Sequence, residues 1–156
     1  MRMPTNKAFR KMTMLLLEET FVGSDKGGNV YLDTGTGWAP TLARLSAEQA
    51  SRTLRPNGTT AAGHVFHTIF YLKLLLKEVR GEAVGKVDWA DSWVMHAVDE
   101  DRWAALKAEL QAGYEELANR LDAAATWAEA ETEAAMAVIA HSAYHLGAVR
   151  QFLTVV

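Results

Sequence analysis

The segment "DEDRWAALKAELQAGYEELANRLDAA", Asp99–Ala124, decides the fold class of this chain. Its apolar side chains recur every three or four residues and therefore form one stripe along an α-helix. The stripe consists of Trp103, Leu106, Leu110, Tyr114, Leu117 and Leu121. Acidic residues open the segment, where they favour a helix N-terminus because the helix dipole is positive there. The segment predicts a long amphipathic helix with one face in a core.

Three further segments show helical periodicity. They run from about Asn6 to Phe21, from Thr60 to Gly81, and from Thr132 to Thr154. Thr59 or Thr60 can cap the second of these helices, and a glycine suits its C-terminal end. Four long helices in 156 residues predict an all-α fold, a four-helix bundle formed by a single domain that spans residues 1–156.

The connections between the helices are of unequal length. About 23–58 joins the first two helices, and so long a connection allows a crossover. Within it, "WAPTLARLSAEQASRTLRP" predicts a short extra helix or two turns, because "SAEQ" has the spacing of a capping box. "NVYLD", residues 29–33, is the only candidate strand. Residues 82–100, which include "VDWADSW", are expected to form an ordered loop.

Composition narrows the possible functions. The chain is 49% hydrophobic and 22% charged, as globular proteins are. Its net charge of −3 gives no reason to expect direct nucleic-acid binding. No stretch approaches the roughly 20 apolar residues of a membrane span, and no signal peptide is recognisable. The absence of cysteine excludes disulfides and thiolate metal sites, and we expect a cytoplasmic protein.

The histidines form the candidate site. His141 and His145 are spaced i, i+4 in "VIAHSAYHLGAVRQFL", residues 138–153, so both imidazoles lie on one helix face. A third histidine from the second long helix would complete a three-histidine shell around a divalent metal, with positions left for water or substrate. The alternative is a set of helical histidines that bind no metal.

The second long helix offers two histidines, His64 and His67. The basic residues of this helix mark its solvent side, and helical-wheel reasoning mildly favours His64 as the inward one. The same reasoning does not exclude His67 as the inward histidine, since apolar residues cover its side of the helix too. His96 falls in the predicted loop and is expected to be exposed. A protease of the HExxH type is not expected, because Ser142 stands where the glutamate would be.

Two of these stretches resemble a known family. "TTAAGHVFHTIFYL", residues 59–72, and "AHSAYHLGAVRQFL", residues 140–153, resemble the DinB/YfiT-like superfamily of four-helix metal-binding proteins. The resemblance implies a zinc or nickel site built from one histidine of the second helix and two of the last. His141 and His145 match the pair. The family's spacing from a threonine at the helix start points to His67, with His64 as the alternative.

The resemblance also implies the chemistry. Members of the family include thiol-dependent transferases and a maleylpyruvate isomerase, in which a low-molecular-weight thiol lies beside the metal. We expect a metal-dependent hydrolase or thiol-dependent transferase that acts on a small molecule and forms a homodimer. The alternative is a non-catalytic metal- or ligand-binding bundle, or a dimerisation module, which the lack of an obvious general base favours.

Other side chains are candidates for supporting roles. A carboxylate hydrogen-bonded to a metal ligand would come from Asp88, Asp91, Glu18 or Glu19. For the two aspartates, helix capping is the alternative. Trp89 and Trp93 can wall a binding pocket, or can plug the end of the bundle or a dimer interface.

Overall fold

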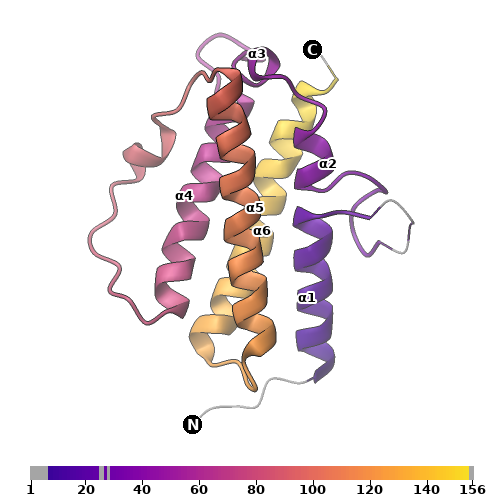
Figure 1. The fold of residues 1–156 in the computed structure, drawn as a ribbon, viewed down its shortest axis with the longest axis vertical. Coiled ribbons are helices and arrows are strands. Elements are labelled where there is room, and N and C mark those ends of the chain that lie inside the picture. Colours follow the sequence, from indigo (N-terminus) through magenta and orange to yellow (C-terminus); the bar gives the residue numbers. More distant parts are fainter. Residues whose placement is uncertain (1–6, 25–26, 28, 155–156) are drawn as a thin grey trace.

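The computed structural model describes residues 7–24, 27 and 29–154. Four long helices lie side by side along the molecule (Figure 1): α1 (Lys7–Phe21), α4 (Ala61–Val79), α5 (Glu100–Ala123) and α6 (Glu129–Phe152). Helices α4 and α1 each contact both α5 and α6. The described residues form no strand, only an isolated bridge between Thr53 and Thr60, so the predicted all-α class is confirmed.

The long helices end where the sequence signals place their caps. The Thr60 hydroxyl accepts a hydrogen bond from the backbone N–H of Gly63 at 3.0 Å, which caps α4. Gly81 follows α4 with a φ of 72°, a conformation that favours glycine. Asp99 caps α5. Helix α6 begins earlier than predicted, because the Glu131 carboxylate accepts a hydrogen bond from the N–H of residue 128 and stabilises an earlier first turn.

The connection between α1 and α4 contains two short helices where one short helix or two turns were predicted. They are α2 (Trp38–Leu42) and α3 (Ala47–Ala50). The predicted capping box is present at the start of α3: the Ser46 hydroxyl accepts from the Gln49 N–H at 3.2 Å, and the Gln49 side chain accepts from the Ser46 N–H at 3.0 Å. The connection is long enough for α1 and α4 to lie apart in space, with α5 and α6 packed between them.

The candidate strand "NVYLD" does not form, and its backbone has another partner. The Glu19 carboxylate of α1, only 5% exposed, accepts hydrogen bonds from the N–H groups of Val30 at 2.8 Å, Tyr31 at 2.9 Å and Leu32. Burial alone would raise the pKa of Glu19, but these three hydrogen bonds outweigh burial and lower it. Because the three donors point at one side chain, they are not available to a sheet.

The segment 82–100 is not a loop throughout. It contains the 3-10 helix η1 (Trp89–Trp93), which packs against α4. The Asp88 carboxylate accepts a hydrogen bond from the Ala90 N–H at 2.9 Å and so caps η1. The capping role weighed for Asp88 is therefore confirmed, and this segment holds aromatic side chains in fixed positions beside α4.

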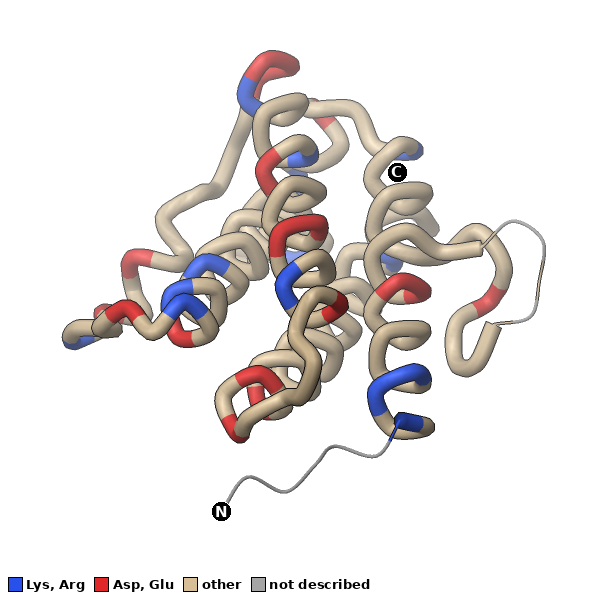
Figure 2. Tube along the Cα trace, turned by 60° about the horizontal axis from the view of Figure 1, so that its bottom comes forward, with Lys and Arg blue, Asp and Glu red and all other residues tan. Residues whose placement is uncertain are grey.

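The core lies between the four long helices. The stripe predicted on α5 is buried except for Tyr114, which is half-buried. Trp103 is fully buried, and its indole N–H donates to the carbonyl of Leu45 at 2.8 Å. Figure 2 shows both signs of charge spread along the helices, and Lys73 of α4 pairs with Glu109 of α5 at 2.9 Å. None of the described helices is long and apolar enough to cross a membrane.

Candidate metal centre

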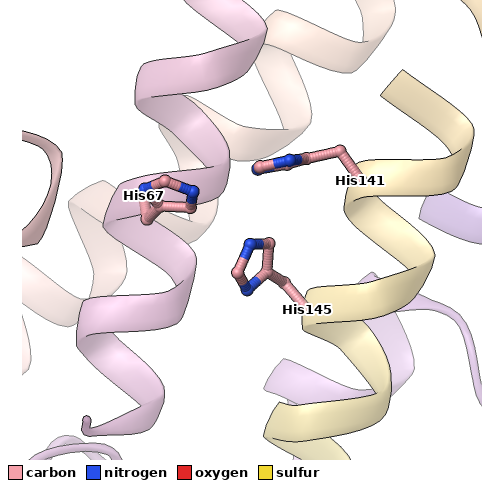
Figure 3. A group of neighbouring side chains, drawn as sticks. All are labelled: His67, His141 and His145. Atoms are coloured by element: carbon pink, nitrogen blue, oxygen red, sulfur yellow. The ribbon is translucent and has the colours of Figure 1, made fainter. Parts of the chain in front are cut away.

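Three histidines converge between α4 and α6 (Figure 3). His67 comes from α4, and His141 and His145 come from successive turns of α6. One ring nitrogen of each histidine lies within 4.8 Å of the others. His67 and His145 are buried, and His141 is half-buried. Three imidazole nitrogens this close together can bind one divalent ion, because histidine is a frequent ligand of zinc and nickel.

The tautomer of His67 follows from its hydrogen bond to η1. Its Nδ1 lies 2.7 Å from the Ser92 hydroxyl, and that hydroxyl donates to the carbonyl of Trp89 at 2.6 Å. A hydroxyl has one proton to give, so Ser92 accepts from His67 and the Nδ1 atom carries the proton. The Nε2 atom of His67 therefore keeps its lone pair, as a metal ligand must.

His145 is held in a similar way by the fourth histidine. The Nδ1 atoms of His145 and His64 lie 3.0 Å apart, a hydrogen bond in which one ring donates to the other. If His145 presents a lone pair at Nε2, its Nδ1–H is the donor and His64 the acceptor. His64 thus supports His145 from outside the group of three. Of the two histidines of α4, His67 is the one that belongs to the converging group.

His141 carries the plainest sign of a missing partner. Its Nε2 atom is buried and has no hydrogen-bond partner among the described residues. A buried polar atom without a partner costs roughly 1–3 kcal/mol, so proteins rarely leave one without a reason. A divalent metal placed between the three rings would bind this nitrogen. The residues present therefore fit a metal ion.

The electrostatic surroundings keep the cluster neutral. Burial, followed by the neighbouring His141, His67 and His64, lowers the pKa of His145 to about 3. Burial and the proximity of His67 lower the pKa of His141 to about 4. Burial also lowers the pKa of His67. The pKa of His64 is lowered by burial and, to a smaller extent, by the neighbouring His67. Since metal ligands must be deprotonated, the cluster is ready to bind a cation at neutral pH.

Aromatic rings wall the cluster. Trp93 stacks on His67 with ring centroids 3.9 Å apart, and Tyr71 stacks on His141 at the same distance, 3.9 Å. Trp89 is 48% exposed and lies 6.2 Å from the ring of Tyr71. Trp93 therefore covers one face of the His67 ring, and Trp89 lies farther from that ring, at a centroid distance of 6.4 Å.

The four carboxylates considered from the sequence do not support the histidines. Glu19 binds the loop described above, Asp88 caps η1, and Glu18 and Asp91 are exposed. None of the four forms a hydrogen bond or ion pair with a histidine of the cluster. The groups that do contact the cluster are the Ser92 hydroxyl of η1, at 2.7 Å from His67, and the His64 imidazole, at 3.0 Å from His145. His96 is exposed, as predicted.

Comparisons with known proteins add no relative. No protein-family model matches the chain, and neither a curated protein nor a solved structure matches it.

Proposed function

We propose that this protein is a metal-dependent enzyme of the DinB-like four-helix-bundle class, with an open three-histidine centre formed by His67, His141 and His145. One observation carries the proposal: three ring nitrogens lie within 4.8 Å of one another, and the Nε2 atom of His141 is buried without a partner. The resemblance of residues 59–72 and 140–153 to that family supports the same ligand set.

The reaction proposed is hydrolysis of a small molecule or transfer of a low-molecular-weight thiol to it. Zinc or nickel would supply a Lewis acid that activates a water or thiol nucleophile. Ser92 and His64 hold His67 and His145 in the orientation that binding requires, through the Nδ1 contacts of 2.7 Å and 3.0 Å. Trp93 and Tyr71 exclude water from the flanks of the cluster.

The test is metal analysis of protein purified without an affinity tag. The wild-type chain is expected to retain close to one equivalent of divalent metal, and a triple His67→Ala, His141→Ala, His145→Ala variant none. His96→Ala is the matched control, because His96 is exposed. A triple variant with the metal content of the wild type would contradict the proposal.

The second candidate is a non-catalytic protein that binds a metal or ligand. It is favoured because no carboxylate of the described residues bonds to the cluster: Asp88 caps η1 and Glu19 binds the loop. The two candidates differ in whether the metal keeps an exchangeable position. Azide should change the visible spectrum of the cobalt(II)-loaded protein if the centre is open. An unchanged spectrum at saturating azide would favour the binding protein.

A homodimer is part of the proposal. Residues 134–149 of α6 include no acidic or basic side chain other than the two cluster histidines. On the outer side of this stretch Met136 is 48% exposed and Tyr144 is 75% exposed. An uncharged helix face with exposed large side chains suits a second copy of the chain. Sedimentation equilibrium should show a dimer, and Tyr144→Lys should shift it toward monomer.

A further inference from the structure

A separate pocket lies at the end of the molecule where α4 begins and α6 ends, at the top of Figure 1. Its volume is about 370 Å³. The polar lining comes from Arg55, Thr59, His64 and Gln151, and Leu54 and Phe152 add an apolar wall. The pocket thus combines one cation, several neutral polar groups and an apolar surface, and no carboxylate is among the described residues that line it.

Three of the pocket's polar side chains are exposed and have no protein partner among the described residues. The side chains of Arg55, Thr59 and Gln151 form no hydrogen bond or ion pair with any residue in the described ranges. Arg52, three residues earlier in the chain, is instead paired with Glu48. A guanidinium presents a planar set of donors that matches a carboxylate or a phosphate group. Arg55 is exposed and its guanidinium is accessible to a ligand, and a pocket whose described lining holds this cation and no acid favours an anion.

The backbone holds Arg55 in a defined place. The Gly58 N–H donates to the Arg55 carbonyl at 3.0 Å, and Asn57, between them, has a φ of 57°. With Pro56 in the second position, these are the features of a type II turn. A β-carbon at Gly58 would lie 3.0 Å from the Arg55 Cγ, so the turn packs closely against the stem of the arginine.

His64 connects the pocket to the histidine cluster. Its ring lines the pocket, and its Nδ1 lies 3.0 Å from the Nδ1 of His145. When His145 presents Nε2 to a metal, His64 accepts at Nδ1 and carries its own proton at Nε2. His64 is then one more neutral donor, and it touches a proposed metal ligand on one side and the pocket on the other.

We propose that this pocket is a subsite for the anionic group of a small organic molecule, a carboxylate or a phosphate, recognised by Arg55 and contacting His64. The proposal narrows the substrate class, and in that respect it rests on the proposed function. The apolar wall formed by Leu54 and Phe152 favours an anion that also carries a hydrocarbon or aromatic part.

Calorimetric titrations test the subsite with three probes: benzoate, its neutral counterpart benzamide, and inorganic phosphate. Each is titrated into the full chain, both metal-free and loaded with cobalt(II). Benzoate or phosphate should bind and benzamide should not. Arg55→Gln should lower the affinity for the anion roughly ten- to hundredfold, the usual cost of losing a charged hydrogen bond. Arg52→Gln, which changes an exposed arginine outside the pocket, should bind like the wild type.

The outcomes are distinguishable. Benzoate binding that depends on Arg55 assigns the subsite to carboxylates, and phosphate binding alone assigns it to phosphate. Equal anion binding by Arg55→Gln and the wild type, or equal binding of benzamide and benzoate, would overturn the subsite. Failure to take up cobalt(II) would instead contradict the proposed function, while titrations of the metal-free protein still decide the subsite. Circular dichroism confirms that each variant is folded.

Discussion

Two buried polar groups in this molecule differ in whether the described residues satisfy their hydrogen-bonding capacity. At the end of α1 the Glu19 carboxylate is 5% exposed and accepts three backbone hydrogen bonds from the loop that follows. Between α4 and α6 the Nε2 atom of His141 is buried and has no partner among the described residues. One site satisfies a buried group from within the chain, and the other leaves it unsatisfied.

The difference separates a group that organises its own chain from a candidate ligand-binding group. A buried charge that finds all its partners in the same chain organises that chain, as Glu19 organises the loop 30–32. A buried nitrogen without a partner keeps its free-energy cost until a ligand or ion binds to it. The Trp38 indole nitrogen and the Ser142 hydroxyl are also buried without a partner among the described residues, but neither belongs to the group of possible ligands. Convergence together with an unmet bond distinguishes the histidine site.

The strongest way to break this comparison is to remove a proposed ligand. His141→Ala should lower the affinity for zinc by more than the ten- to hundredfold that residues bonded to a ligand typically contribute. The same change should leave the helical content intact, because His141 is only half-buried. Competition with a chromophoric chelator measures the affinity. An unchanged affinity would remove His141 from the metal site.

The next largest effect concerns the satisfied site. Glu19→Gln keeps the shape of the side chain but replaces a charged acceptor of three hydrogen bonds with a neutral one. Since hydrogen bonds to charged groups contribute more than neutral ones, the free energy of unfolding should fall by about 2 kcal/mol. Urea unfolding of the metal-free protein measures it. Glu18→Gln, which changes an exposed neighbour, is the control and should have almost no effect.

The charge of Glu19 also predicts a pH dependence. Its pKa in the folded protein lies below the ordinary value of 4.5, despite burial, because of the bonds from Leu32, Val30 and Tyr31. Its contribution to stability is therefore fully present above the pKa of the unfolded chain, and it is lost as the pH falls through the lower pKa of the folded state. The stability difference between wild type and Glu19→Gln should shrink below pH 4.5. A constant difference down to pH 2 would show that the charge is not responsible.

A smaller effect is expected where the chain supports a ligand. Ser92→Ala removes the acceptor that holds the Nδ1 proton of His67 at 2.7 Å. Loss of such a partner should weaken metal binding by roughly tenfold, the lower end of the usual range. Serine 46, at the start of α3, provides a control: Ser46→Ala removes a helix cap but lies outside the cluster. Equal metal affinities of the two variants would mean that Ser92 does not orient His67.

The smallest effect has the opposite sign. His141→Phe fills the same space with an apolar ring and removes the unpartnered nitrogen, while the stacking face toward Tyr71 is kept. The metal-free variant should be more stable than the metal-free wild type by about 1 kcal/mol. Chemical unfolding in the presence of a chelator measures the difference. A loss of stability would indicate that the nitrogen already has a partner, such as an ordered water.

Periodicity and caps made much of the fold predictable. The apolar stripe of α5, the threonine cap of α4 and the capping box of α3 are local signals, and each acts where the sequence places it. The spacing of His141 and His145 likewise predicts one shared face. Such features depend on residues within one or two turns of each other, so a single sequence contains all the information needed to find them.

The rest depends on contacts between distant segments. The bond from His67 to Ser92 joins α4 to η1, and the bond between His64 and His145 spans two helices. The helical wheel ranked His64 ahead because it averages directions and omits the exact packing of neighbours. "NVYLD" has the residue types of a strand, but a carboxylate eleven residues or more away takes its backbone donors. No local pattern reveals such a partner.

The short helix η1 has a kinetic consequence. It brings Ser92, which binds His67, and Trp93, which covers the same ring, to the cluster on one turn, and irregular segments flank that turn on both sides. Segments of this kind open more readily than long packed helices, and they do so without global unfolding. The rate at which a metal enters or leaves should therefore follow the local opening of residues 82–98, which amide hydrogen exchange can time against metal release.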